Sequence, residues 1–327
     1  MKKILSIMLT ILMSLTFVGC GEKQNDNDTT KIGVLQLAEH PALDQSYKGF
    51  MDALKDAGYV ENDNITVDYK NAQGEVSNCE TIASKFVNDK VDLILAIATN
   101  AAQAAANATD TIPVVLTAVT NPEYSGLVES NEKPNCNVTG TSDLTPVTEQ
   151  IDLLKQLLPE AKNVAVLYNG AEDNSIYQAD LAKTAIQKNG MNCKEVSVSE
   201  LSQIQQVVES LVGKVDAIYI PTDNLLAEGM ATVGMIANDN KIPVIVGEEG
   251  MCANGGLATY GLSYYNLGYK AGEMAASILK GENTPENMAI EYLPAEDCVL
   301  TINMETVKTL GITIPDDILA KAVKINE

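Results

Sequence analysis

Residues 91–100 read VDLILAIATN, a continuous apolar run that passes directly into a short Ala-rich stretch. An unbroken apolar run of this length predicts a strand that is buried on both faces, as in the middle of a parallel sheet. Thr99 follows the run and is placed to cap a helix that extends to about residue 107. A buried strand that leads into a helix is the repeating unit of α/β folds, so this stretch predicts a parallel sheet covered by helices.

The same alternation of strand and helix continues on both sides of this stretch. It forms two series, each with its own first strand, and this pattern predicts an α/β protein of two doubly wound, Rossmann-like lobes with parallel sheets and right-handed crossovers. The expected strands are 31–37, 65–71, 91–98, 112–118, 163–168, 194–198, 217–220 and 243–246, and the expected helices are 43–57, 77–88, 99–107, 147–158, 176–189, 202–212 and 225–238.

The remaining segments are too few for a third domain. Strands are expected at 257–260, 290–293 and 299–302, and helices at 265–280 and about 304–310. We expect these segments to complete the two lobes, so that the chain crosses between them more than once and forms a hinge of several strands. The expected division is an N-terminal lobe of residues 31–142 and 258–290 and a C-terminal lobe of residues 143–257 and 291–327.

The first 20 residues predict export. Two lysines precede a mostly apolar run from residue 4 to 18, which is typical of a secretory signal peptide and too short to cross a bilayer as a helix. The stretch FVGC, which ends at Cys20, resembles a lipobox, although Phe17 stands where Leu is usual. We expect acyl chains on Cys20 to anchor the protein outside the cytoplasm, with residues 21–30 as a flexible tether. The alternative is an ordinary cleaved signal with an incidental cysteine.

Composition and charge exclude several classes of function. A formal net charge of -22 argues against nucleic acid and anionic membrane surfaces as partners. His40 is the only histidine, and the sequence contains no P-loop or nucleophile elbow, so we expect no metal, no cofactor and no catalysis. The cysteines beyond Cys20 are scattered and odd in number, and we interpret them as small, mostly buried residues: Cys79, Cys136, Cys193, Cys252 and Cys298.

Polar side chains follow the strands of the first series where a ligand would bind. In open parallel sheets, ligands bind outside the carboxyl ends of the strands. Thr99 and Asn100 open a helix there, and the free N–H groups of a helix N-terminus suit a carboxylate. Thr117 and Thr120, on the neighbouring loop, could complete this anion site. The alternatives are simple helix capping by Thr99 and local turn hydrogen bonds by the other two threonines.

Carboxyl groups follow the strands of the second series. Asp223 comes directly after the buried run AIYIP, and Glu248 and Glu249 follow PVIV. One of these acids could pair with an ammonium group, so that the two lobes together would suit a zwitterion. The alternative is that they are solvated loop acids. Asn174 and Ser175 begin another helix and could either cap it or donate to the ligand.

Six segments together resemble one protein family. They are HPALD (40–44), IATNAAQA (97–104), PVVLTAVTNP (113–122), VLYNGAEDNS (166–175), YIPTDN (219–224) and GGLATYGLSYYNLG (255–268). In number and order they are similar to the tryptophan/tyrosine-type substrate-binding lipoproteins of ABC importers, over nearly the whole mature chain. The resemblance implies the type I periplasmic-binding-protein fold, with three crossings between the lobes and a cleft that holds an amino acid, often an aromatic one.

The resemblance also implies roles for particular residues. The α-carboxylate of the ligand would be held by Thr99, Asn100, Ala118 and Thr120, and the α-ammonium by Asp223 or Glu249. The side-chain pocket would be lined by the loops that contain His40, Asp44, Glu172, Asn174 and Ser175. The implied partner is an ABC permease in the membrane, to which a monomeric binding protein presents its ligand after hinge closure.

Two alternatives stay open at this point. The same fold could bind a nucleoside or a sugar, in a cleft that uses stacked aromatic rings and several acids or amides. A secreted enzyme could instead use Asp223 and Glu249 as paired acids.

Overall fold

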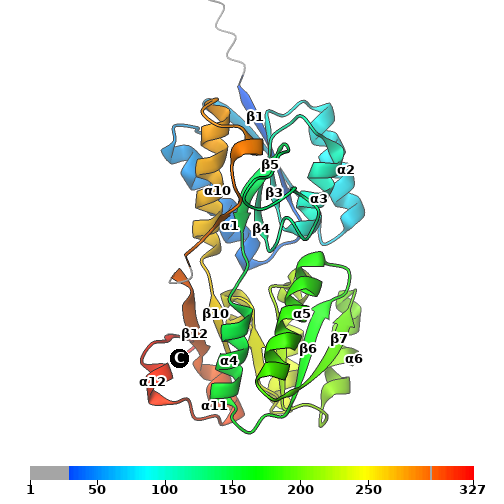
Figure 1. Cartoon of the computed structure of the whole chain (residues 1–327), viewed down its shortest axis with the longest axis vertical. Coiled ribbons are helices and arrows are strands. Elements are labelled where there is room, and N and C mark those ends of the chain that lie inside the picture. The colour runs from blue at the N-terminus through cyan, green and yellow to red at the C-terminus, as the bar shows by residue number, and fades with distance from the viewer. Residues whose placement is uncertain (1–28, 295–296) are drawn as a thin grey trace, which may run out of the picture.

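The computed structural model describes residues 29–294 and 297–327 as two α/β lobes that follow one another along the long axis of the molecule (Figure 1). The expectation of two doubly wound lobes is confirmed by the order of strands in two separate sheets. The predicted signal peptide (1–20), Cys20 and nearly all of the predicted tether (21–30) lie outside the described residues.

The first lobe is built on a six-stranded, wholly parallel sheet with the order β11-β5-β4-β3-β1-β2. Helices α1 and α10 pack together on one side of this sheet, and α2 and α3 pack together on the other (Figure 1). The elements of this lobe are β1 (Thr30–Gln36), α1 (Pro41–Asp56), β2 (Ile65–Asn71), α2 (Val76–Asn88), β3 (Leu93–Ile97), α3 (Thr99–Ala108), β4 (Val114–Val119), β5 (Val138–Ser142), α10 (Tyr264–Leu279), the 3-10 helix η1 (Pro285–Asn287) and β11 (Glu291–Tyr292).

The second lobe is built on a seven-stranded sheet with the order β13-β12-β10-β9-β8-β6-β7, in which only the β10–β12 pair is antiparallel. One apolar core lies under α4, α5, α11 and α12, and a second lies under α6 to α9. The elements are α4 (Val147–Leu157), β6 (Asn163–Asn169), α5 (Asp173–Lys188), β7 (Asn192–Val198), α6 (Leu201–Leu211), β8 (Ala217–Ile220), α7 (Asn224–Glu228), α8 (Met230–Asp239), β9 (Val244–Val246), α9 (Glu249–Ala253), β10 (Ala258–Gly261), β12 (Val299–Asn303), α11 (Met304–Leu310), α12 (Asp316–Leu319) and β13 (Val323–Ile325).

In the described part of the chain, three connections pass between the lobes, at residues 143–146, at residues 262–263 and between β11 and β12. Two of the expected lobe boundaries are wrong. Strand β10 pairs with β9 and β12 in the second sheet, so residues 258–261 belong to the C-terminal lobe. Strand β11 pairs with β5 in the first sheet, so residues 291–292 belong to the N-terminal lobe. Apolar patterning predicts that a strand exists, but it does not identify the sheet that the strand joins.

The helix expected at 225–238 is two helices, because the chain breaks at Gly229 between α7 and α8. A Cβ atom at this position would lie 2.2 Å from Cδ1 of Ile204 on α6, so a larger residue here would displace the end of that side chain. The break leaves α7 as a short helix with its N-terminus at the lobe boundary, where Asp223 caps it.

Helices α1 and α10 approach so closely that glycines form their contact. A Cβ atom at Gly268 would lie 1.9 Å from the carbonyl oxygen of Ser46, and one at Gly49 would lie 2.0 Å from that of Tyr265. This contact explains the small residues of α10, and it fixes the two helices whose first turns begin beside His40 and Tyr264.

Within the described part of the chain, none of the helices is long and apolar enough to cross a membrane. All five cysteines of this part are free thiols, and Cys79 and Cys252 are fully buried.

We expect Gly268→Ala to destabilise the protein, although alanine favours helices over glycine by about 1 kcal/mol in an exposed site. The added methyl group would push α10 away from Ser46, and overpacking of this kind costs about 1–3 kcal/mol in the free energy of unfolding. Urea denaturation would measure the loss. Gly170→Ala is the matched control, since its Cβ would meet nothing nearer than 3.4 Å, and an equal effect of the two changes would contradict the packing argument.

Candidate functional site

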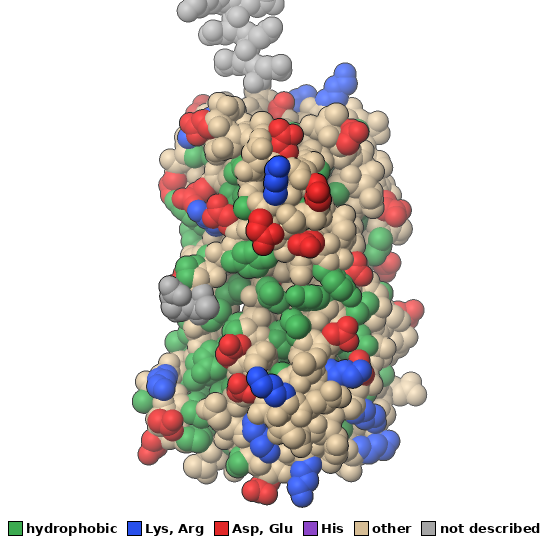
Figure 2. All heavy atoms as spheres, viewed as in Figure 1, with side chains coloured by type: hydrophobic (Ala, Val, Ile, Leu, Met, Phe, Trp, Pro, Cys, Tyr) green, Lys and Arg blue, Asp and Glu red, His purple; other side chains and the backbone are tan. Residues whose placement is uncertain are grey.

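A small cavity lies where the two lobes meet. Its volume is ≈ 10 Å³, about the space that holds one water molecule, and the first crossing and both lobes contribute to its wall. Apolar side chains gather on the outer surface at the same level (Figure 2). The lining residues are His40, Leu43, Ala118 and Tyr264 from the first lobe, Asp143 from the crossing, and Asn174, Thr222, Asp223, Asn224, Ala227 and Glu248 from the second lobe.

Asp223 reaches the cavity because it is the N-cap residue of α7, three residues after the end of β8. Its carboxyl group accepts hydrogen bonds from the backbone N–H of Leu226 (2.8 Å) and of Asn169 (2.5 Å). Burial raises the pKa of Asp223 to about 7, and the nearby charge of Glu172 acts in the same direction, while the two backbone hydrogen bonds oppose the rise. The sequence therefore indicated correctly that this acid follows a buried strand and faces the lobe boundary.

Glu248, and not Glu249, lines the cavity. Glu248 is the N-cap residue of α9, and its carboxyl group accepts hydrogen bonds from the backbone N–H groups of Gly250 and Met251, both at 2.6 Å. Burial raises the pKa of Glu248 to about 7. Glu249 is the first residue of the helix, and its side chain is exposed outside the cavity. Glu249, which the resemblance offered together with Asp223 for the ammonium group, therefore does not line this cavity.

Asp143 is a third buried carboxyl group in the cavity wall, and sequence reasoning missed it. It accepts hydrogen bonds from Thr120 Oγ1 and from the hydroxyl of Tyr264, each at 2.8 Å. Burial raises the pKa of Asp143. Thr120 in turn accepts a hydrogen bond from Gln178 Nε2 of the second lobe at 3.2 Å. Asp143 follows β5, a polar strand with the sequence VTGTS that has no apolar run to reveal it.

A second polar network joins the lobes through Glu172, the N-cap residue of α5. The carboxyl group of Glu172 accepts hydrogen bonds from the side-chain amides of Asn169 (3.0 Å), Asn174 (3.2 Å) and Asn224 (2.8 Å). Asn224 Oδ1 then lies 3.2 Å from His40 Nε2 of the first lobe. Burial lowers the pKa of His40, which favours the neutral ring. Asn224 and Thr222, on either side of Asp223, also line the cavity, and sequence reasoning did not identify them.

The expected anion site at α3 is only partly as predicted. The N-cap residue is Ala98, with a φ of 83°, and Thr99 is the first residue of the helix, so Thr99 does not cap it. The hydroxyl of Thr99 is fully buried and has no hydrogen-bond partner among the described residues. Asn100 lines a neighbouring pocket of ≈ 380 Å³, which Glu172 and Asn224 also line.

Three other predicted site residues lie away from the cavity. Thr117 is buried beneath it, where its hydroxyl accepts a hydrogen bond from Thr141 at 3.0 Å. Ser175 is buried behind Asn174, whose side-chain amide donates to its hydroxyl at 3.3 Å. Asp44 is exposed on α1 and accepts a hydrogen bond from Gln36 Nε2 at 2.8 Å. By contrast, Ala118 does line the cavity, with a φ of 56°.

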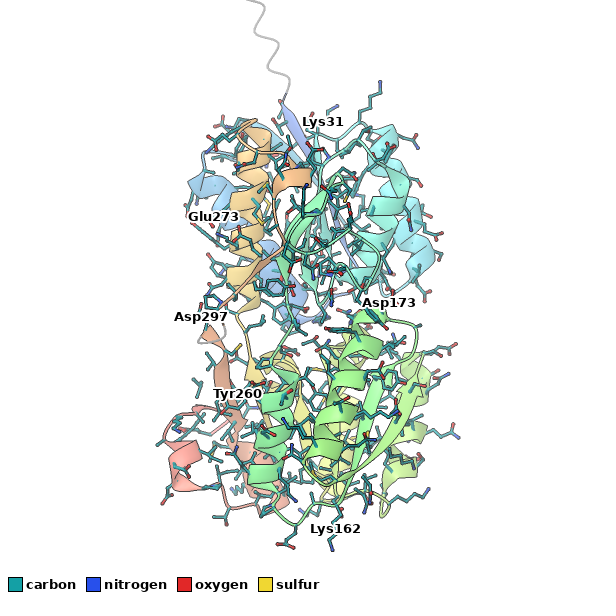
Figure 3. The ribbon with its side chains drawn as sticks, viewed as in Figure 1. Lys31, Lys162, Asp173, Tyr260, Glu273 and Asp297 are labelled. Carbon is teal, nitrogen blue, oxygen red and sulfur yellow. The ribbon has the colours of Figure 1, made fainter. Side chains whose placement is uncertain are left out.

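The lobes also contact each other outside the cavity. Gln103 Nε2 on α3 donates to the carboxyl group of Asp173 at 2.8 Å, and Figure 3 shows Asp173 at the end of α5 that faces the first lobe. Nearby, the rings of Tyr124 and Tyr177 pack with centroids 4.9 Å apart. These contacts hold the lobes in a closed arrangement around the cavity.

The ionisable groups that line the cavity are acidic. Asp143, Asp223 and Glu248 all line it, and its lining in the described part of the chain contains no lysine or arginine. Acidic groups in a low-dielectric, enclosed space attract a positively charged group strongly. The arrangement is therefore suited to bind a cation such as an ammonium group.

We expect the buried acids to make the ligand-free protein less stable as the pH rises. Glu248 has an ordinary pKa of 4.5 when unfolded and about 7 when folded, so between these values the folded state binds more protons and raising the pH favours unfolding. Glu248→Gln lacks this group and should not lose stability in the same way. The difference in the free energy of unfolding, variant minus wild type, should therefore grow by about 2 kcal/mol between pH 5 and pH 8. Urea denaturation at a series of pH values would measure it.

Glu160→Gln is the control for this experiment, because this glutamate is exposed in the turn after α4 and is not among the charges that act on Glu248. Curves for Glu248→Gln that run parallel to the wild type would show that Glu248 is not held at a raised pKa.

The chain is similar over almost its whole length to proteins that have been characterised. It is 44% identical over 323 residues to the tyrosine-binding protein of Clostridioides difficile, which covers 95% of this chain and 93% of that protein. A solved structure of the ABC domain in complex with L-Trp from Streptococcus pneumonia is 36% identical and superimposes with a TM-score of 0.87, covering 90% of this chain and 99% of that one.

A second solved structure shows a similar protein with its lobes open. It is the ligand-free, open structure of a substrate-binding protein with adhesive properties from Clostridium difficile, and it is 44% identical over 90% of this chain and 99% of that one. Its TM-score is only 0.69, although its sequence is more similar than that of the L-Trp complex. The lobes of the present structure are therefore arranged more like those of the L-Trp complex than like those of the open structure.

The fold is the type I periplasmic-binding-protein fold, as the resemblance implied. Residues 31–326 match the family model described as ABC transporter substrate binding protein. The match spans both lobes and the three crossings, and this chain therefore belongs to the family of ABC transporter substrate-binding proteins.

Proposed function

We propose that this chain captures an amino acid, with an aromatic side chain, in the cavity between its lobes and presents it to an ABC permease. The observation that carries the proposal is a cavity between the two lobes whose described lining contains three buried carboxyl groups and no lysine or arginine. The relatives add support, since one is named for binding tyrosine and another was solved with L-Trp.

The α-ammonium group of the ligand is bound by the buried acids. Asp223 and Glu248 both line the cavity, and both have a pKa raised by burial. A bound ammonium group would favour their ionised forms and would neutralise charge that is costly to bury alone. In this proposal Glu248 takes the role that the sequence had offered to Glu249.

The α-carboxylate of the ligand is bound at the start of α3 and on the adjacent loop after β4. Helix α3 has ten residues, and its first N–H groups are free to bind an anion. The fully buried Thr99 hydroxyl has no partner among the described residues, which suits a donor that awaits a ligand. Asn100, Ala118 and Thr120 belong to the same proposed site, whereas Thr117 is occupied by Thr141 beneath it.

Ligand entry requires the lobes to move. A cavity of ≈ 10 Å³ is far smaller than an amino acid, and the lobe-to-lobe contact between Gln103 and Asp173 closes the boundary. The three crossings can act as a hinge. The higher TM-score with the L-Trp complex than with the ligand-free, open structure supports a closed state of this kind for the present arrangement.

Proteins of this family work outside the cytoplasm, and we propose that this one is a monomer held at the membrane by acyl chains on Cys20. The lipobox-like stretch FVGC, the apolar run before it and the polar residues 21–30 after it support this anchor.

Isothermal titration should show that L-tyrosine or L-tryptophan binds with a dissociation constant in the micromolar range or below, about -8 kcal/mol or stronger. Asp223→Asn should weaken binding by about 30-fold or more, since it removes one partner of a buried ion pair. Glu249→Gln is the matched control and should bind like the wild type. Small-angle scattering of the same samples should show a smaller radius of gyration with ligand. Absence of binding heat for all common amino acids in the titration would refute the assignment.

Incorporation of a labelled fatty acid tests the anchor. The full-length protein expressed in a bacterium should take up label, and Cys20→Ser should abolish it, because only Cys20 stands in the lipobox-like stretch. Cys79→Ser is the control, since this thiol is fully buried. Equal labelling of the wild type and of Cys20→Ser would show that the cysteine is incidental.

A further inference from the structure

His40 lines the cavity and has a ring nitrogen without a hydrogen-bond partner among the described residues. It lies just before α1 in the first lobe, it is only 7% exposed, and its ring lines the cavity wall. One ring nitrogen, Nε2, lies 3.2 Å from Asn224 Oδ1 across the lobe boundary. The other, Nδ1, is buried and has no partner among the described residues.

The neighbours of His40 fix which nitrogen carries the proton. The amide of Asn224 donates through Nδ2 to Glu172 Oε2 at 2.8 Å, and its backbone N–H donates to the same oxygen at 3.3 Å. Asn224 must therefore present its carbonyl oxygen to His40, and Nε2 must be the donor in that contact. Burial is the largest influence on His40 and lowers its pKa, so the ring is neutral and Nδ1 has a free lone pair.

Asn174 supplies a second unused acceptor on the same cavity. Its Nδ2 lies within hydrogen-bond distance of three acceptors that share its two hydrogens, Glu172 Oε2 (3.2 Å), Thr222 O (3.1 Å) and Ser175 Oγ (3.3 Å). This fixes the amide orientation and turns Oδ1 away from those groups. Oδ1 is buried without a partner among the described residues, in a side chain that is 4% exposed. Buried acceptors without a donor are costly, so both atoms suit a donor brought by the ligand.

Apolar side chains line the same cavity as His40. Leu43 lies three residues after His40, and Ala227 lies three residues after Asn224, so each shares a helix face with the polar residue before it. Leu43 and Ala227 both line the cavity. Such a setting suits an aromatic ring that carries a hydrogen-bond donor on its edge, whereas the ammonium group has buried carboxyl groups elsewhere in the same cavity.

We propose that His40 Nδ1 and Asn174 Oδ1 form a subsite that requires an O–H or N–H donor on the aromatic side chain of the ligand, so that tyrosine and tryptophan are selected over phenylalanine. This inference rests on the proposed function and narrows its substrate class. A site built to hydrogen-bond such a group rejects the analogue that lacks it, because its own polar atoms are then left unpaired. His40 thereby determines specificity, through a tautomer that Glu172 and Asn224 set.

The first test compares L-tyrosine with L-phenylalanine and with 4-fluoro-L-phenylalanine, which has a similar shape but no donor. We expect the wild type to bind tyrosine at least about 10-fold more tightly than either analogue. In His40→Phe, which keeps a ring and removes the acceptor, this preference should fall to about threefold or less, through loss of tyrosine affinity alone. His40→Gln, which keeps an acceptor, should retain part of the preference.

Nitrogen NMR of the imidazole gives a second readout that needs no variant, because His40 is the only histidine in the chain. The ring should be the neutral Nε2–H tautomer, and the Nδ1 signal should move on binding of tyrosine but not of phenylalanine. A proton on Nδ1 in the ligand-free protein would overturn the proposal.

The possible failures are distinguishable. Equal binding of tyrosine and phenylalanine to the wild type, or an equal loss of both in His40→Phe, would overturn the side-chain subsite. The amino-acid function would survive that result. Absence of binding for tyrosine, tryptophan and phenylalanine alike would overturn the proposed function and this inference together.

Discussion

Three carboxyl groups are buried between the lobes, and the described lining of the cavity contains no lysine or arginine to neutralise them. The rest of the site depends on this uncompensated burial of acidic groups. Each acid is held by hydrogen bonds from its own side of the boundary. Asp143 is held by Thr120 and Tyr264, Asp223 by backbone N–H groups around α7, and Glu248 by backbone N–H groups of α9. Each half of the site is therefore formed before the lobes meet. Closure concentrates negative charge in an enclosed space, and a ligand that carries a positive charge offsets the cost.

The acids and polar groups share a structural origin. His40, Glu172, Asp223 and Glu248 are the N-cap residues of α1, α5, α7 and α9, each in an extended backbone conformation at the end of a β-to-α connection. A residue in this position leaves the sheet at its carboxyl edge, where the cleft lies. Repeated use of the same position places four functional side chains on one surface, while the strands beneath them remain apolar.

This origin explains how far the sequence could predict the site. The apolar runs located the strands, and Asp223 was identified because it follows such a run, whereas the loops of Glu172 and His40 were identified through the family resemblance. The choice between Glu248 and Glu249 could not be made, because it depends on which residue caps α9, and a shift of one residue turns the side chain from the cavity to solvent. Asp143 was missed because β5 consists of small and polar residues. The sheet joined by β10 was mistaken because pairing partners depend on the tertiary fold, which patterning within one strand does not encode.

The glycine contact between α1 and α10 joins segments that are more than 200 residues apart in the chain, on either side of nearly the whole second lobe. During synthesis the first sheet and α1 emerge early, but the partner surface of α1 is missing until α10 has been made. The core of the first lobe therefore cannot be completed before most of the second lobe has been synthesised, because α10 follows that lobe in the chain. A nascent chain with this topology keeps an apolar helix face uncovered for most of its length, which delays compact folding until translation is almost finished.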